Sequence, residues 1–210
     1  MTAMTHTPQH RVSRVVASER AEVGELADAS LWSMGPAEAA ETLVELTRLG
    51  AQVTELTLRV AAHAETVRVG EATGAVSTGA WWAHQTRQTR SAAARSMHLA
   101  AALAGPRTLV RVALAAGDLN LDQAEVIVRA VDALPSDLVT DDIRAEVEAH
   151  LIGHAGEYDA KALRVLGKRA LDVIAPEIGE AHENRVLGRE EAQALAAARF
   201  TMTDDGHGKT

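Results

Sequence analysis

The sequence predicts an all-α protein, a multi-helix bundle with one long helix near the N-terminus. Hydrophobic residues fill 47% of the 210 positions, enough for a sizeable core, yet the chain has only one Phe, one Tyr and three Trp. A core of mainly Ala, Leu and Val favours closely packed helices over a sheet filled by aromatic side chains. Apolar residues also recur three and four positions apart, which is the spacing of a helix face.

The first predicted elements are a disordered start (1–11), a short acid-rich helix (12–29) and a long helix that runs from Pro36 to about Val69. Along the long helix, apolar residues and one histidine alternate three and four apart. This heptad seam consists of Leu46, Leu49, Val53, Leu56, Val60, His63 and Val67. It predicts a helical hairpin or a short coiled coil, with the partner helix in the same chain or in another one. We expect His63 to lie at this helix contact and not to bind a ligand.

Short helices separated by turn residues are predicted in the middle of the chain. After a Gly/Thr/Ser loop (70–77), Ser77 suits the N-cap of a short helix that Trp81 and Trp82 anchor to the core. Thr89 is a suitable N-cap for the next helix, 90–104. Gly and Pro at 105–106 end that helix and open another, and the later helices are predicted at 121–134, 141–154, 160–174 and 177–199.

Two weaker features complete the predicted architecture. Alanine pairs with the same nine-residue spacing, Ala83 with Ala92 and Ala115 with Ala124, indicate two stacked helix-turn-helix-like units. The C-terminal residues 200–203 are the one segment with the character of a strand. We therefore divide the chain into a disordered start (1–11), a helical domain (12–199) and the beginning of a strand and turn (200–210).

The charge distribution is the main functional signal. Residues 72–117, called the acid-free strip below, contain no Asp or Glu, whereas the rest of the chain has 16 Lys and Arg against 29 Asp and Glu. A basic surface on an acidic protein suits double-stranded DNA, because it attracts phosphates locally while the remaining surface suppresses indiscriminate binding. The candidate contacts are Arg87, Arg90, Arg95, Arg107 and Arg111.

The five arginines differ in their expected positions. Arg87 and Arg90 flank the N-terminus of the helix that Thr89 caps, where DNA-reading helices present side chains and where the helix dipole favours phosphate. Arg95 follows as a backbone contact, and Arg107 and Arg111 rank last. The alternative is that these arginines form ion pairs with acid-rich segments around 19–28, 38–55 or 137–148.

No constellation in the sequence supports catalysis or metal binding, so we expect a chain without cofactor or enzymatic activity of its own. There is no Cys, and His150 and His154, with Glu146 one turn earlier, lack a third ligand and are predicted to be exposed. The cluster Asp204, Asp205 and His207 is explained by a turn. Without a signal peptide or a membrane span, we expect a cytoplasmic protein with no membrane partner.

An ordered series of short segments resembles a known family. The series is STGAWWAH at 77–84, SAAARSMHLAAAL at 91–103, ALAAGDL at 113–119 and AEVI at 124–127, followed by APE at 175–177, Arg185, REE at 189–191 and FTMTDDGHG at 200–208. It resembles the actinobacterial domain of unknown function 222, also called the 13E12 repeat family, from about Val44 to the C-terminus. One departure concerns a turn, since the family usually has glycine where Arg87 stands.

The resemblance implies an association with HNH endonucleases. Family members often continue into a C-terminal HNH domain, so we expect this chain to correspond to a truncated, N-terminal half that lacks the HNH motif. Together with the charge pattern, this predicts a non-catalytic accessory domain that positions DNA. The alternative is a protein-interaction module that self-associates through the heptad seam, or that binds a downstream nuclease domain.

Overall fold

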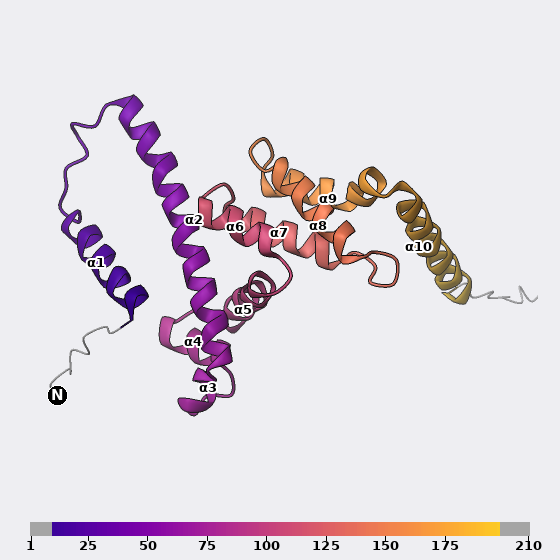
Figure 1. Cartoon of the computed structure of the whole chain (residues 1–210), viewed down its shortest axis with the longest axis horizontal. Coiled ribbons are helices and arrows are strands. Elements are labelled where there is room, and N and C mark those ends of the chain that lie inside the picture. The colour runs from indigo at the N-terminus through magenta and orange to yellow at the C-terminus, as the bar shows by residue number, and fades with distance from the viewer. Residues whose placement is uncertain (1–9, 198–210) are drawn as a thin grey trace, which may run out of the picture. The chain divides into compact units, whose positions relative to one another are not determined.

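The structure is a computed structural model that describes residues 10–197 (Figure 1). Within these residues every regular element is a helix, which confirms the predicted all-α class. The predictions for residues 1–9 and for the strand and turn at 200–210 lie outside the described part of the chain. The chain forms two compact units, 1–44 and 45–210, each described by itself below.

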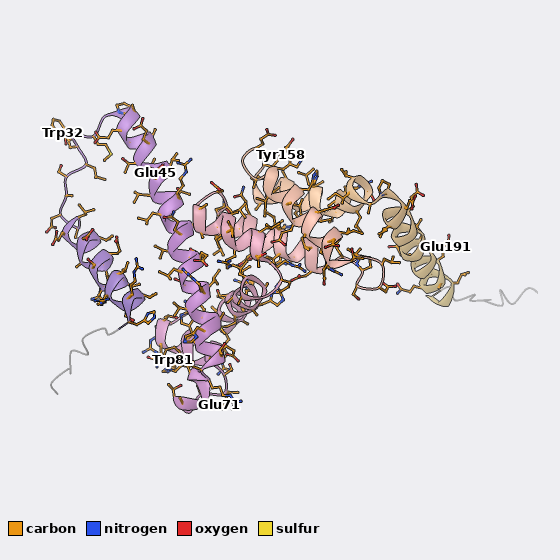
Figure 2. All side chains as sticks on the ribbon, in the orientation of Figure 1. Trp32, Glu45, Glu71, Trp81, Tyr158 and Glu191 are labelled. Carbon is orange, nitrogen blue, oxygen red and sulfur yellow. The ribbon has the colours of Figure 1, made fainter. Side chains whose placement is uncertain are left out.

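The first unit contains α1 (Arg11–Glu25) and the beginning of α2 (Pro36–Thr66). The His10 side chain caps α1 by accepting a hydrogen bond from the backbone N–H of Val12 (3.2 Å). No residue of α1 is buried, and in the loop that follows the Trp32 side chain is 95% exposed (Figure 2). The unit therefore contributes no buried core residue of its own in its described part.

The long helix α2 begins at Pro36, as predicted, but ends earlier than predicted and is followed by the four-residue helix α3 (Val69–Ala72). The break falls at Arg68, whose backbone is left-handed (φ 55°). Behind it, Gly70 lies against the chain at Ser77 and Thr78, where an added Cβ would approach backbone atoms to 2.5 Å. This close approach replaces the simple loop predicted over 70–77.

Four helices of the second unit start or stop at the residues that the sequence predicts. They are α4 (Thr78–Thr86), α5 (Arg90–Ala104), α6 (Thr108–Ala116) and α7 (Leu121–Asp132). Gly117 ends α6 in the left-handed conformation (φ 82°), which glycine adopts without a steric penalty. Asn120 and Gln123 form a reciprocal capping box at the start of α7, which satisfies two backbone N–H groups there.

The remaining helices are α8 (Asp141–Gly153), α9 (Ala160–Ile174) and α10 (Pro176–Ala197). Helix α7 is central, since it packs against α5, α6, α8 and α9 (Figure 1). Its end is tied to α8 by Arg144, whose guanidinium donates to the carbonyl oxygens of Val131 (2.8 Å) and Leu134 (3.0 Å). The fully buried side chains of this unit include Leu114, Leu119, Ile127, Val131, Val147, Leu151 and Leu163.

Two helix–turn–helix arrangements follow each other in the second unit. In the first, three residues join α4 to α5, and in the second, four residues join α6 to α7. The two arrangements are in contact, because α5 packs against both α6 and α7. Within residues 10–197 no single helix has both the length and the apolar character needed to cross a membrane.

Candidate nucleic-acid interface

The α4–α5 unit positions three of the five candidate arginines. Ser77 begins α4 by accepting a hydrogen bond from the N–H of Ala80, and Thr89 begins α5 by accepting one from the N–H of Ala92, each at 3.1 Å. Both predicted N-caps are thus confirmed. Trp82 packs against the hydrophobic core and holds α4 in place. The turn between the two helices is consequently short and fixed at both ends.

Arg87 occupies the C-cap of α4 with a left-handed backbone (φ 60°, ψ 24°). The N–H of Gln88 donates to the carbonyl of Ala83 (3.0 Å), which is the hydrogen bond of a Schellman-type helix end. Glycine is the residue that adopts this conformation most readily, and it is the one that the resembled family usually has here. The turn therefore keeps the geometry that suits glycine although an arginine occupies it.

Arg87, Arg90 and Arg95 are all exposed, and none of them forms an ion pair within residues 10–197. The alternative that these three arginines pair with acid-rich segments therefore finds no support in the described part of the chain. The first turn of α5 contains no acidic residue, so its free N–H groups and the positive end of its dipole add to the arginine charges. This end of α5 is a local concentration of positive charge.

Arg107 has a different environment, because it is buried with 6% of its surface exposed. Its Nε and Nη2 atoms donate to Oδ1 of Asp132 at 3.0 and 2.7 Å. A buried guanidinium that is already bonded to a carboxylate cannot reach a DNA phosphate, so we remove Arg107 from the proposed contacts. Arg111 is half-buried and forms no ion pair in the described residues.

Glu148 completes an internal polar cluster that the sequence did not reveal. Its side chain is 2% exposed, and Oε1 accepts a hydrogen bond from the N–H of Val110 (2.8 Å) in the first turn of α6. Burial raises the pKa of the Glu148 carboxyl above its usual value, although the Val110 hydrogen bond and the nearby Arg107 guanidinium act in the opposite direction. Glu148 thus caps α6 from a distant helix.

The heptad seam lies on an exposed face of α2. Leu46, Leu49, Val53, Val60 and Val67 are between 43% and 58% exposed, while Leu56 is half-buried and His63 is exposed. The buried residues of the same helix lie on another face and are Ala51, Glu55, Leu58 and Ala61. Helix α2 therefore has two apolar faces, of which only one is packed inside the second unit.

The histidine pair is also placed by the structure. The rings of His150 and His154 are 4.8 Å apart in an edge-to-face arrangement, and the Tyr158 ring follows at 5.8 Å from His154. Both imidazoles are half-buried, which differs from the predicted exposure. Within residues 10–197, no group of three potential ligand side chains converges on one point.

These features define an all-α protein with two consecutive helix–turn–helix units, the first of which presents arginines around the start of its second helix that have no ion-pair partner in the described residues. The sequence profile of the family described as "Domain of unknown function (DUF222)" matches residues 13–201, and the chain belongs to this family. The match begins well before Val44, the approximate start of the region over which the short segments predict the resemblance. No curated protein and no solved structure shows significant similarity to the chain.

Proposed function

We propose that this chain is a helical accessory domain that positions double-stranded DNA through Arg87, Arg90 and Arg95. The observation that carries the proposal is the exposure of these three arginines, without an acidic partner in the described residues, around the N-terminus of one capped helix. Phosphate oxygens would accept hydrogen bonds from the guanidinium groups and from the free N–H groups of α5.

The acidic remainder of the molecule supports the same proposal. With a formal net charge of −8, the protein as a whole repels nucleic acid, so any binding depends on the local arginine surface. In this proposal the domain orients the duplex, and the bond-breaking chemistry belongs to an HNH domain of the kind that the family resemblance implies. In this proposal the chain holds the duplex in position and does not itself break the phosphodiester bond.

DNA binding is tested by fluorescence anisotropy with a labelled duplex at several salt concentrations. Replacing Arg87, Arg90 and Arg95 together by Ala should abolish most binding and lower the slope of log K against log salt by about 2.7, at about 0.9 for each lost phosphate contact. The matched control replaces Arg11, Arg14 and Arg20 of α1, which changes the net charge equally. Equal binding by the triple variant and the parent would contradict the proposal.

We also propose a second candidate function, self-association of two copies of the chain through the heptad seam. The supporting observation is the exposed apolar face of α2, since monomeric proteins rarely leave such a face uncovered. The seam places Val at one core position of each heptad (Val53, Val60) and Leu at the other (Leu49, Leu56), a combination that favours parallel two-stranded coiled coils.

The flanks of the seam fit a second copy of the same helix. In a parallel pair, Glu45 would face Gly50 of the other copy, and the next two pairs would be Gln52 with Thr57 and Arg59 with Ala64. None of these pairs brings like charges together, and the small residues on one flank allow the helices to approach closely. The seam is therefore compatible with self-pairing.

Sedimentation equilibrium tests self-association. The parent should form a dimer that dissociates when Leu49 and Leu56 are both replaced by Glu, because two charges would enter the apolar contact. The control variant replaces Leu187 and Leu195, two exposed leucines of α10, by Glu and should remain dimeric. A parent that stays monomeric at high concentration would rule out this second function.

A further inference from the structure

We infer that a groove between α7 and α9 is a second phosphate-contacting surface, which binds the backbone of the same DNA duplex through Arg129, Arg164 and Lys168. The inference rests on the proposed DNA-binding function and extends it from the α4–α5 turn to two other helices. None of the three residues belongs to the acid-free strip.

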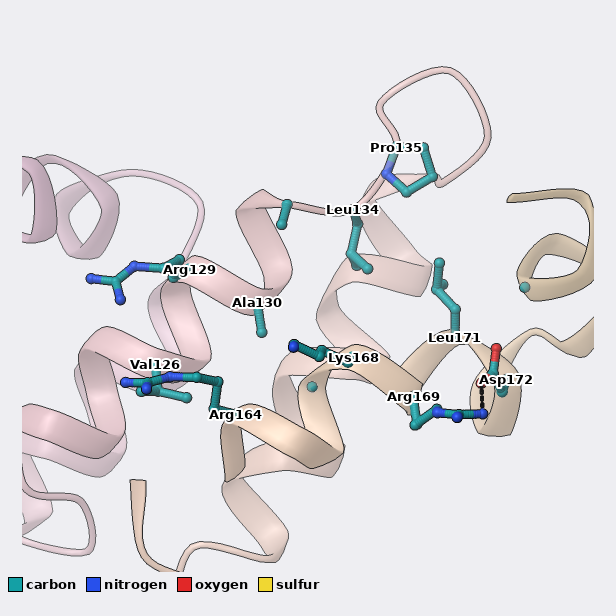
Figure 3. A pocket seen from close by; sticks show the side chains of 13 residues that line it. Val126, Arg129, Ala130, Leu134, Pro135, Arg164, Lys168, Arg169, Leu171 and Asp172 are labelled. Carbon is teal, nitrogen blue, oxygen red and sulfur yellow. Dashed lines mark ion pairs between the residues drawn. The ribbon is translucent and has the colours of Figure 1, made fainter. Parts of the chain in front are cut away.

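The groove has a volume of about 790 Å³ and is lined mainly by residues of α7 and α9 (Figure 3). Figure 3 shows the side chains of Arg129, Arg164 and Lys168 extending to the same side, whereas Arg169 extends away from them to its partner Asp172. Three cations from two helices thus project together at this groove.

The acidic residues near the groove are already engaged. Asp172 forms an ion pair with Arg169 (3.7 Å), and the half-buried Glu125, which lines an adjacent hollow, forms a long ion pair with Arg129 (3.8 Å). Arg164 and Lys168 are exposed and form no ion pair in the part of the chain that the structure describes. Two full positive charges are therefore available to an anionic ligand, and Arg129 is only weakly held.

Closely packed residues of α7 and α9 form part of the groove wall. This wall contains small and apolar residues, among them Val126, Ala130 and Leu171. Gly167 of α9, which also lines the groove, lies so close to α7 that an added Cβ would be 2.7 Å from the Cβ of Ala130. The close packing of α7 on α9 anchors the groove on two helices of the core, and the loop after α7 (133–135) completes its lining.

A second hollow lies beside the groove and is lined by one arginine of α5, Arg95. It has a volume of about 370 Å³ between α5 and α7 and is lined by Arg95, His98 and Arg129, among others. Arg129 therefore lines both hollows. Two acidic residues, Glu125 and Asp132, also line this hollow. Asp132 is bonded to Arg107 (2.7 Å). Glu125 pairs with Arg129 (3.8 Å), so both carboxylates have partners within the protein.

The resulting line of cations consists of Arg95 on α5, Arg129 on α7, and Arg164 and Lys168 on α9. These four side chains come from three helices and line two hollows, a wider spread than a single carboxylate or a free phosphate needs. They suit a ligand with regularly spaced negative charges. The phosphodiester backbone of a duplex has this property and already meets Arg95 in the proposed function.

The test compares duplex binding by the full chain with Arg164→Ala and Lys168→Ala combined, again by anisotropy over a range of salt concentrations. The double variant should weaken binding and lower the salt slope by about 1.8, since two phosphate contacts are lost. Arg14→Ala combined with Arg20→Ala is the matched control, because it removes the same charge from exposed positions of α1. Lys168→Arg should keep the binding of the parent.

The outcomes separate the inference from the proposed function. One outcome is that the variant that lacks Arg87, Arg90 and Arg95 loses binding while the variant that lacks Arg164 and Lys168 keeps it. In that case the groove plays no part and the proposed function stands. If both the α9 variant and the α1 control weaken binding equally, the effect is one of net charge and the inference is wrong. If the parent does not bind duplex DNA, both are wrong. Melting temperatures of the variants check that each one is folded.

Discussion

The ionisation of Glu148 is coupled to folding. Its buried carboxylate accepts the N–H of Val110, and burial raises its pKa above the usual value. The native state therefore binds the proton of this carboxyl more tightly than the unfolded state does. The resulting contribution to stability is fully present below the usual pKa and is lost as the pH rises through the raised pKa.

The substitution Glu148→Gln tests this effect. The amide oxygen of Gln can still accept the Val110 hydrogen bond, but it does not ionise. We expect the variant to match the parent in free energy of unfolding near pH 4 and to be the more stable protein near pH 7, as measured by urea unfolding at each pH. Glu146→Gln, an exposed change on the same helix, is the control. Parallel pH profiles for parent and Glu148→Gln would show that this carboxyl does not contribute.

Arg107 shows why single residues could not all be assigned from the sequence. It belongs to the same acid-free strip as Arg87 and Arg90, and composition does not distinguish the three. Its partner Asp132 is 25 positions away and comes close only because α6 and α7 pack together. Which arginines remain free for a ligand is decided by tertiary contacts, and these leave no local signal.

At the scale of helices, most starts were predictable because caps are local. Ser77, Thr89 and Asp159 each bond an N–H three positions further on, so the signal and its effect lie within one turn. The end of α2 was not predictable in this way. It depends on the approach of Gly70 to the backbone at Ser77, a contact between segments on either side of a turn.

The packing of α7 on α9 leads to a prediction about Gly167. Replacing glycine by alanine inside a helix normally stabilises a protein by about 0.5–1 kcal/mol. At Gly167, however, the new methyl group would lie 2.7 Å from the Cβ of Ala130, so we expect a net destabilisation of about 1–3 kcal/mol. Chemical denaturation of the parent and of Gly167→Ala measures the difference in their free energies of unfolding.

A matched control for that change is Gly50→Ala in α2, where no atom lies within 4 Å of the added Cβ. This variant should be as stable as the parent or slightly more stable. If Gly167→Ala stabilised the protein to the same extent as Gly50→Ala, helices α7 and α9 would not be in tight contact at Gly167.

At the scale of the whole molecule, the fold class and the family were accessible from the sequence, and the second basic surface was not. The acid-free strip is visible because its charges follow each other along the chain. Arg129, Arg164 and Lys168 lie in segments of mixed charge, and only the packing of α7 against α5 and α9 lines them up. Charges that come together from three helices do not form a cluster in the sequence, so composition along the chain does not reveal them.

The backbone of Arg87 has a final consequence, which concerns the balance between stability and function. An arginine in the left-handed region costs about 1–2 kcal/mol relative to the preferred helical conformation, a penalty that glycine avoids. Replacing Arg87 by glycine would therefore give a more stable turn and remove one positive charge from the surface proposed to contact DNA. If Arg87 contacts DNA as proposed, its side chain exchanges part of the stability of the turn for a positive charge at the start of α5.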